Sequence, residues 1–310
     1  MSEIMDRPTN TPVGLLKSIE LEITGGCQLT CSHCLSDSSP QGTHGSMTPA
    51  DWEQVIQDAA ALEIPNVQLI GGEPTLHPRW TGLVELALSQ GQAVEVYSNL
   101  FHVSRRAWDV FARDGVTLAT SYYSDRAEEH DRITRRPGSY ARTRANIDEA
   151  RRRGIALRAG IVEVFEGQRV QEARAQLEGM GVTTVTMDRV RAVGRAAGDE
   201  APSVDALCGR CGRGRAAVLP NGDLTLCVMS RHMPCGNVRE DRLADLVGSE
   251  RWWRAVESVP APTGAGCAPD DSACQPGQTA CLPKFPNSPN PSPSPFLSIP
   301  VLLPTPERTQ

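Results

Sequence analysis

Three cysteines lie close together near the start of the chain, in the sequence Cys27-Gln-Leu-Thr-Cys31-Ser-His-Cys34, after a strand-like run and a Gly25-Gly26 pair. Three thiolates on one short loop can bind three irons of a [4Fe–4S] cluster, which usually takes four cysteines. The remaining iron would keep an open coordination position, and such a position makes a metal site reactive rather than structural. The loop therefore predicts a reactive iron–sulfur centre.

Two other interpretations of this loop start from the same residues. Cys31 and Cys34 alone have the spacing of a redox CxxC pair. All three cysteines could instead bind zinc together with His33 or His44. The rest of the chain favours the cluster.

Composition limits the class of protein. The chain has 310 residues, 39% hydrophobic content and a net charge of −6, which gives no support for a nucleic-acid partner. The first residues contain no apolar signal segment, and no apolar run is long enough to span a membrane. A chain of this length with ten cysteines is then expected to be a cytoplasmic metalloprotein rather than a disulfide-rich secreted one.

Helix and strand signals alternate along the next part of the chain, which predicts a parallel sheet with helices outside it. In such folds the functional residues gather at the carboxyl ends of the strands. We expect strands at 18–24, 66–70, 93–98, 116–121, 155–164 and 182–187, helices at 48–62, 79–89, 104–114, 139–153 and 168–180, and a loop at 122–138.

Short polar or glycine-rich motifs follow these expected strands. Gly71-Gly72-Glu73 ends the second strand, Ser98-Asn99 ends the third, and Ser121 ends the fourth. Glycines allow close backbone approach to a ligand, and the Glu73 carboxylate can accept charge-assisted hydrogen bonds from an ammonium group. All these residues are expected on the same rim as the cysteine loop.

The CxxxCxxC loop after a first strand, followed by Gly71-Gly72-Glu73, resembles the signature of the radical S-adenosylmethionine (SAM) superfamily. The resemblance implies a partial (β/α)6 barrel. It also implies that the open iron chelates the amino and carboxylate groups of SAM, and that an electron from the cluster splits SAM to a 5′-deoxyadenosyl radical. The residues that it assigns to SAM are Gly71, Gly72, Glu73, Ser98, Asn99 and Ser121.

One further stretch resembles peptide-modifying members of that superfamily. His130-Asp131-Arg132-Ile-Thr-Arg135 followed by Gly138-Ser-Tyr is similar to their "His-Asp-x-x-Arg-Gly … Gly-Ser-Phe" run, with one extra residue, while Tyr123 departs from their Ser-x-Asp pattern after Ser121. An arginine could pair with the SAM carboxylate. The candidates are Arg135, Arg158 and Arg191, and a surface role is the alternative for each.

A second group of cysteines occupies the last third of the chain. Residues 216–227 read as a β-hairpin around Asn221-Gly222, and the spacing from Cys211 through Gly222 to Cys227 resembles SPASM and twitch domains, which carry auxiliary iron–sulfur clusters. One or two auxiliary [4Fe–4S] clusters are implied, with zinc as the alternative and Cys235 as a possible hydrogen-atom donor. The seven cysteines are Cys208, Cys211, Cys227, Cys235, Cys267, Cys274 and Cys281.

The sequence thus predicts an α/β protein with a partial TIM-like barrel followed by a small cysteine-rich domain with a β-hairpin. The expected function is radical modification of a ribosomally made precursor peptide, by cross-linking or epimerisation. Expected partners are that peptide, a separate leader-peptide-binding protein, and an electron donor such as flavodoxin or ferredoxin. The alternatives are a radical SAM enzyme acting on a small molecule and a non-catalytic zinc or iron–sulfur scaffold. The expected divisions are an N-terminal extension at 1–17, the barrel at 18–200, the auxiliary domain at 201–282, and a Pro-rich disordered tail at 283–310.

Overall fold

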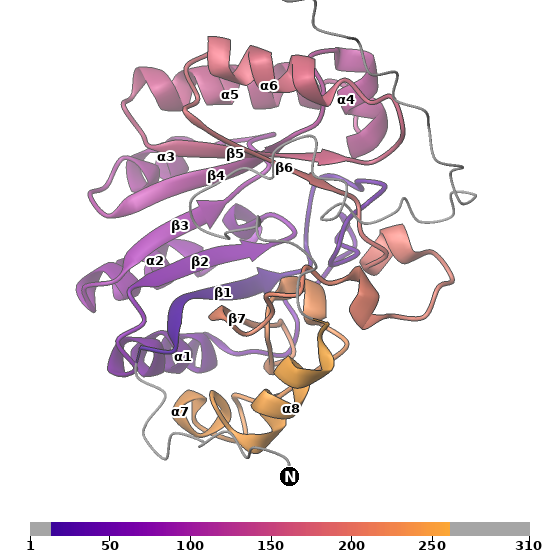
Figure 1. Ribbon diagram of the computed structural model, residues 1–310. Helices are drawn as coiled ribbons and strands as arrows, with labels where there is room; N and C mark the ends of the chain where they lie inside the picture. The colour runs from indigo at the N-terminus through magenta and orange to yellow at the C-terminus, as the bar shows by residue number, and fades with distance from the viewer. Residues whose placement is uncertain (1–13, 261–310) are drawn as a thin grey trace, which may run out of the picture.

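The computed structural model describes residues 14–260, and these residues form a curved sheet covered by helices (Figure 1). The sheet has nine strands in the order β6-β5-β4-β3-β2-β1-β7-β8-β9. Neighbours from β6 to β7 are parallel, and the last two pairs are antiparallel. The strands are β1 (Leu16–Thr24), β2 (Asn66–Gly71), β3 (Ala93–Tyr97), β4 (Val116–Tyr122), β5 (Leu157–Glu163), β6 (Thr184–Arg189), β7 (Gly214–Val218), β8 (Asp223–Thr225) and β9 (Gly236–Asn237).

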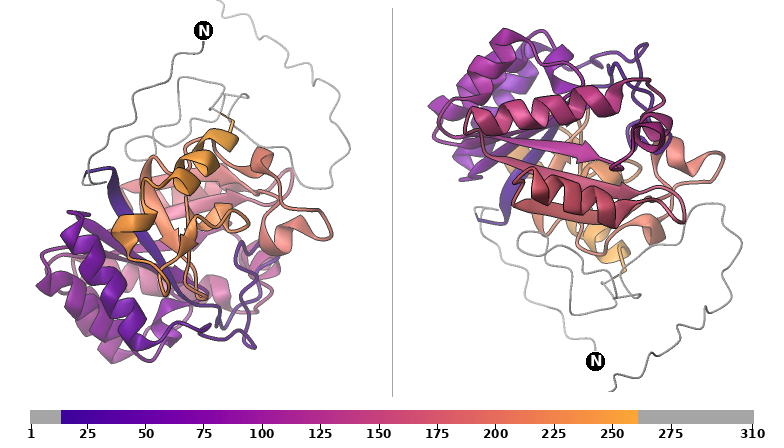
Figure 2. Two further views of the ribbon diagram at one scale, coloured as in Figure 1. Left: turned by 90° about the horizontal axis from the view of Figure 1, so that it is seen from below. Right: turned by 90° about the horizontal axis from the view of Figure 1, so that it is seen from above.

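Helices connect the parallel strands and pack on one face of the sheet, where Trp52 and Ile56 join the core of Ile19 and Leu21. Figures 1 and 2 show α5 and α6 side by side over β5. No helix in the described residues is both long and apolar enough to cross a membrane. The α-helices are α1 (Pro49–Ala61), α2 (Trp80–Ser89), α3 (Arg105–Phe111), α4 (Ala127–Thr134), α5 (Ser139–Arg152), α6 (Val170–Gly179), α7 (Leu243–Leu246) and α8 (Glu250–Ser258).

The alternation expected from the sequence is confirmed, with strand and helix limits shifted by a few residues. The start of α1 shows why. The Thr48 hydroxyl accepts a hydrogen bond from the Asp51 amide at 3.2 Å, and the Asp51 carboxylate accepts one from the Thr48 amide at 2.8 Å. This reciprocal cap fixes the first turn of the helix.

The expectation of a loop across 122–138 is wrong, because α4 (Ala127–Thr134) lies within it. The helix buries only His130, Ile133 and Thr134, so its apolar periodicity is too weak to be read from sequence. Tertiary packing and the acidic residues of its first turn stabilise it instead.

The expected hairpin is confirmed: β7 pairs with β8 around Asn221 and Gly222, and Gly222 has a φ of +90°. β7 also pairs in parallel with β1, so the sheet of the barrel continues across the expected boundary at residue 200. The four divisions of the chain remain predictions, and the tail expected at 283–310 lies outside the described residues.

Candidate active site at the carboxyl rim

The cysteine loop begins where β1 ends and is closed by backbone hydrogen bonds. The Gly25 amide donates to the Thr43 carbonyl at 2.7 Å, and the Cys27 amide donates to the Ser39 carbonyl at 2.9 Å. This closure holds the segment between them at the carboxyl rim of the sheet.

The thiols of the loop are free and lie near one another. Burial, together with the neighbouring thiols of the loop, raises the pKa of the Cys27 and Cys31 thiols to about 12. Backbone amides already point at the sulfurs: Leu29 donates to the Cys27 Sγ at 3.4 Å and Ser38 to the Cys34 Sγ at 3.3 Å. Such N–H···S contacts stabilise thiolates, which are the form that binds metal.

The Gly71-Gly72-Glu73 segment lies against the backbone of this loop. The Gly72 amide donates to the Thr24 carbonyl at 2.7 Å, and the Glu73 amide donates to the Gly26 carbonyl at 2.8 Å. A Cβ at Gly72 would lie 2.3 Å from the Gly26 carbonyl oxygen. Glycine is therefore required for this close approach.

Glu73 has a fully buried side chain that accepts hydrogen bonds from the end of β3 and from the turn after Glu73 itself. Its Oε2 accepts from the Ser98 hydroxyl at 3.1 Å and the Asn99 amide at 2.9 Å. Its Oε1 accepts from the Thr75 hydroxyl at 2.7 Å. Burial raises the pKa of this carboxyl, and no cationic group within residues 14–260 pairs with it. Hydrogen bonds therefore satisfy both oxygens of this buried carboxyl group, while no charge of the described chain neutralises it.

Asn99 connects the Glu73 site to the cysteine loop. Its Nδ2 lies 3.5 Å from the Cys27 Sγ and donates to the Gln28 Oε1 at 3.3 Å. Five of the six residues assigned to SAM therefore meet beside Cys27. They are Gly71, Gly72, Glu73, Ser98 and Asn99.

Ser121, the sixth, is placed differently: its hydroxyl contacts the Tyr97 hydroxyl at 3.3 Å. Among the candidate arginines, Arg158 forms a bidentate pair with Glu95 at 2.6 Å, and Arg191 pairs with Asp188 at 2.9 Å. Arg135 is exposed and ends α4 in a left-handed conformation. Arg158 and Arg191 thus have carboxylate partners of their own.

Arg195, which no sequence motif indicated, donates hydrogen bonds that stabilise the cysteine loop. Its guanidinium donates to the Cys31 carbonyl at 2.6 Å and the Ser38 carbonyl at 2.8 Å, and its backbone amide donates to the Cys34 carbonyl at 2.9 Å. The guanidinium also pairs with Asp37 at 2.8 Å. These contacts link residues far apart in the chain, so no local motif could have indicated them.

The second cysteine group is only partly described. The Cys211 and Cys227 sulfurs lie 3.7 Å apart, and Cys208 hydrogen-bonds to Cys211, which lowers the pKa of Cys208 and raises that of Cys211. Cys235 is buried, and burial raises its pKa to about 11. Cys267, Cys274 and Cys281 lie outside the described residues.

Within 14–260, no three His, Cys, Asp or Glu side chains have the spacing that would hold a single metal ion. His44 contacts the Thr24 hydroxyl at 2.8 Å, and the His33 ring packs edge-on against Tyr123. In a [4Fe–4S] cluster each cysteine binds a different iron, so the three sulfurs do not need to point at a single metal position.

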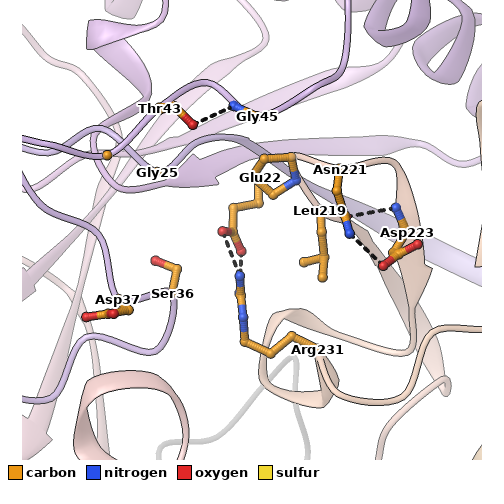
Figure 3. Close-up of a pocket in the computed structure, with 12 residues that line it drawn as sticks. Glu22, Gly25, Ser36, Asp37, Thr43, Gly45, Leu219, Asn221, Asp223 and Arg231 are labelled. Atoms are coloured by element: carbon orange, nitrogen blue, oxygen red, sulfur yellow. Dashed lines mark hydrogen bonds and ion pairs between the residues drawn. The ribbon is translucent and has the colours of Figure 1, made fainter.

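A cavity of about 470 Å³ lies between the cysteine loop and the hairpin turn at 219–223 (Figure 3). Its lining includes the buried ion pair between Glu22 and Arg231, whose closest atoms are 2.6 Å apart. Ser36, another lining residue, contacts the Cys34 sulfur at 3.6 Å. A molecule in this cavity would therefore lie next to the cysteine loop.

Comparison with known proteins agrees with this geometry. Residues 21–165 match the model of the radical SAM superfamily, and residues 208–268 match that of SPASM, an iron–sulfur cluster-binding domain. The chain is 29% identical to the AdoMet-dependent heme synthase of Methanosarcina barkeri over 46% of this chain and 40% of that protein. It is also 29% identical to the PqqA peptide cyclase of Ruegeria pomeroyi over 44% of this chain and 37% of that protein. These matches span about two-fifths of each relative.

Solved structures show the same fold. Streptococcus suis SuiB bound to its precursor peptide SuiA superposes with a TM-score of 0.66 at 12% identity, over 79% of this chain and 67% of that one. The enzyme anSMEcpe with bound AdoMet superposes with a TM-score of 0.64 at 11% identity, over 79% and 84% of the two chains. The chain therefore belongs to the radical SAM superfamily, with a radical SAM domain followed by a SPASM domain.

Proposed function

We propose that this radical SAM enzyme modifies a ribosomally made precursor peptide, by cross-linking or epimerisation. The observation that carries its SAM chemistry is the hydrogen-bonded connection from Glu73 through Asn99 to Cys27. This connection places a buried carboxyl group beside the thiols that we assign to the cluster.

The residues fit both cofactors. Cys27, Cys31 and Cys34 are free thiols close to one another, and Glu73 is a buried carboxylate without a cationic partner in the described chain. When bound, a [4Fe–4S] cluster and SAM supply a one-electron cleavage that yields a radical able to remove hydrogen from unactivated carbon.

The protein's own contribution at this site is positioning. Glu73 would accept hydrogen bonds from the ammonium group of SAM. The Ser98 hydroxyl and the Asn99 amide hold the Glu73 carboxyl group in place. The glycines at 71 and 72 let the two strand ends approach one another. The cavity beside the cysteine loop receives the substrate.

Support for a peptide substrate comes from similar proteins, since one relative is named a PqqA peptide cyclase and SuiB is bound to a precursor peptide. Cys208, Cys211 and Cys227 are assigned to an auxiliary cluster on the basis of their proximity. Cys235, Cys267, Cys274 and Cys281 would complete it or form a second one. A separate protein would present the leader segment of the peptide, and a flavodoxin or ferredoxin would supply electrons.

The test is anaerobic reconstitution followed by iron and sulfide counting, and an assay for 5′-deoxyadenosine with SAM and dithionite. Three clusters predict about twelve irons, and two predict about eight. The Cys31→Ala Cys34→Ala variant should keep the auxiliary irons and lose cleavage. Bound zinc without cleavage would contradict the enzymatic proposal and leave the scaffold.

A small-molecule substrate is the second candidate. The inner face of the barrel carries charged pairs, Arg158 with Glu95 and Arg215 with Glu20, where other barrels pack branched aliphatic side chains. A polar interior suits a small charged substrate, and one relative is a heme synthase. Mass spectrometry of a precursor peptide encoded beside the gene, before and after incubation with the enzyme, separates the two candidates.

A further inference from the structure

Four exposed arginines lie around the corner between α4 and α5, next to the cysteine loop. They are Arg132, Arg135, Arg136 and Arg142, and we call them the arginine patch. In the described chain none of the four is paired with a carboxylate, and the stretch 132–147 contains no acidic residue. Unpaired like charges repel one another, so this surface is suited to an anionic partner.

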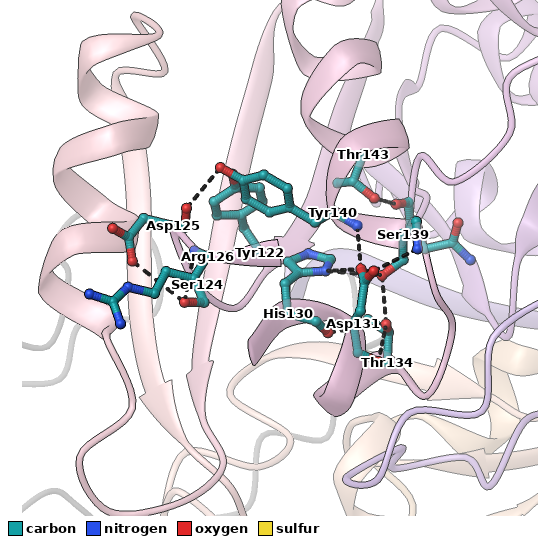
Figure 4. Close-up of polar contacts among 12 residues, drawn as sticks. Tyr122, Ser124, Asp125, Arg126, His130, Asp131, Thr134, Ser139, Tyr140 and Thr143 are labelled. Atoms are coloured by element: carbon teal, nitrogen blue, oxygen red, sulfur yellow. Dashed lines mark hydrogen bonds and ion pairs between the residues drawn. The ribbon is translucent and has the colours of Figure 1, made fainter. Parts of the chain in front are cut away.

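The corner that carries the patch is held in one conformation. Asp131 Oδ1 accepts hydrogen bonds from the Tyr140 amide and the Ser139 hydroxyl, each at 2.8 Å (Figure 4). Its Oδ2 accepts from the Gly138 amide at 2.6 Å. The arginines therefore stand on a fixed backbone, which reduces the entropy lost when a partner binds.

One aromatic ring separates the patch from the cysteines. The guanidinium carbons of Arg142 and Arg136 lie 4.8 Å and 5.3 Å from the centre of the Phe101 ring. Phe101 itself packs in a small cluster with Cys27 and Cys31.

The backbone makes a second connection between the patch and the cysteine loop. The Ser32 amide donates to the Ile133 carbonyl at 2.9 Å, and the Thr30 amide donates to the Thr134 carbonyl at 3.3 Å. A partner seated on the patch would therefore be close to the site of reduction.

We propose that the arginine patch docks an acidic electron-carrier protein of the flavodoxin or ferredoxin type. The inference rests on the proposed function, because it assumes a cluster on Cys27, Cys31 and Cys34. The carrier is oxidised by one electron, and that electron enters the site held by the three cysteines. An acidic precursor peptide is disfavoured as occupant, since no patch residue lines the cavity.

The test compares two double variants that lose the same charge. Arg136→Gln Arg142→Gln changes the patch. Arg174→Gln Arg254→Gln changes a half-buried arginine of α6 and an exposed arginine of α8, each of which pairs within its own helix. The rate of cluster reduction by reduced flavodoxin is followed by stopped-flow absorbance at several salt concentrations. The binding of oxidised flavodoxin is measured separately by calorimetry.

We expect the patch variant to be reduced about tenfold more slowly at low salt, with a weaker salt dependence and weaker flavodoxin binding. The control variant should match the wild type, and dithionite-driven cleavage should be unchanged in both. Arg136→Lys Arg142→Lys, which keeps the charge, should restore the rate if charge rather than packing on Phe101 is responsible.

Equal reduction rates in the patch and control variants would overturn the proposal. So would an unchanged reduction rate with weakened binding of the precursor peptide, which would assign the patch to the peptide. A wild type that fails to cleave SAM with dithionite would instead refute the proposed function. Flavodoxin binding would still decide the docking site in that case, because it does not require turnover.

Discussion

The guanidinium of Arg195 donates a hydrogen bond to the carbonyl oxygen of Cys31 at 2.6 Å, across 164 positions of sequence. This contact couples the segment after β6 to the centre of the cysteine loop. We expect Arg195→Ala to lower the iron retained at this loop and to shift the reduction potential of its cluster, because both geometry and a nearby positive charge are lost.

Arg195→Lys keeps the charge but not the two-pronged donor geometry. Arg195→Lys should bring the reduction potential of the cluster back towards the wild-type value more fully than it restores the iron retained at the cysteine loop. Iron analysis and redox titration of a variant lacking the auxiliary cysteines would check this, and a wild-type potential in Arg195→Ala would contradict it.

Glu73→Gln removes the negative charge while keeping the size of the side chain. A hydrogen bond to a charged group contributes about 1.5–3 kcal/mol, so SAM affinity should fall by about 10- to 150-fold. Calorimetry on the reconstituted protein measures it. Ser98→Ala, which removes one donor to the same carboxylate, serves as the comparison and should lower affinity less.

Gly72→Ala places a Cβ 2.3 Å from the Gly26 carbonyl oxygen. Neither backbone can move without breaking the contacts of the cysteine loop, so we expect a loss of about 1–3 kcal/mol in the free energy of unfolding. Gly82→Ala in α2 is the matched control, because its Cβ would meet no atom within 4 Å. It should stabilise the protein slightly. Urea unfolding measures the change in the free energy of unfolding for both variants. Equal changes in Gly72→Ala and Gly82→Ala would contradict the prediction.

Arg231→Met leaves the buried Glu22 carboxylate without its partner. Breaking such a pair costs about 3–5 kcal/mol, and Glu22→Gln Arg231→Met should recover most of that loss. Urea unfolding of the two single variants and the double variant forms the cycle. Additive effects would show that the pair is not coupled.

His130 makes stability depend on pH. Burial lowers its pKa to about 4, below the value of about 6.5 in an unfolded chain. The buried neutral ring thus contributes its full stability above pH about 6.5, and that contribution is lost as the pH falls towards 4. The loss approaches about 3 kcal/mol. Unfolding of wild type and His130→Phe between pH 7 and 5 measures the difference, which should shrink as the pH falls.

The sequence predicted the barrel because its strands and helices carry local signals, such as the cap at Thr48 and the run before Gly71. It also predicted the rim, since the carboxyl ends of parallel strands share one edge. The helix α4 was missed because packing stabilises it, with Ile133 and His130 as its buried contacts. Arg195 was missed because its partners are distant in sequence, and Ser121 shows that a strand end alone does not fix where a hydroxyl points.

The parallel pairing of β7 with β1, which matches Glu20 with Ala217, has a consequence for electron transfer. The cysteine loop follows β1, and Cys227 follows the hairpin that starts with β7. The register of the β1–β7 pairing therefore sets the distance between the cysteine loop and Cys227. Lengthening the connection at 198–203 should leave the gap between them unchanged. Inserting a single residue in β7 would shift it by about 3.3 Å and reverse which side chains face the interior.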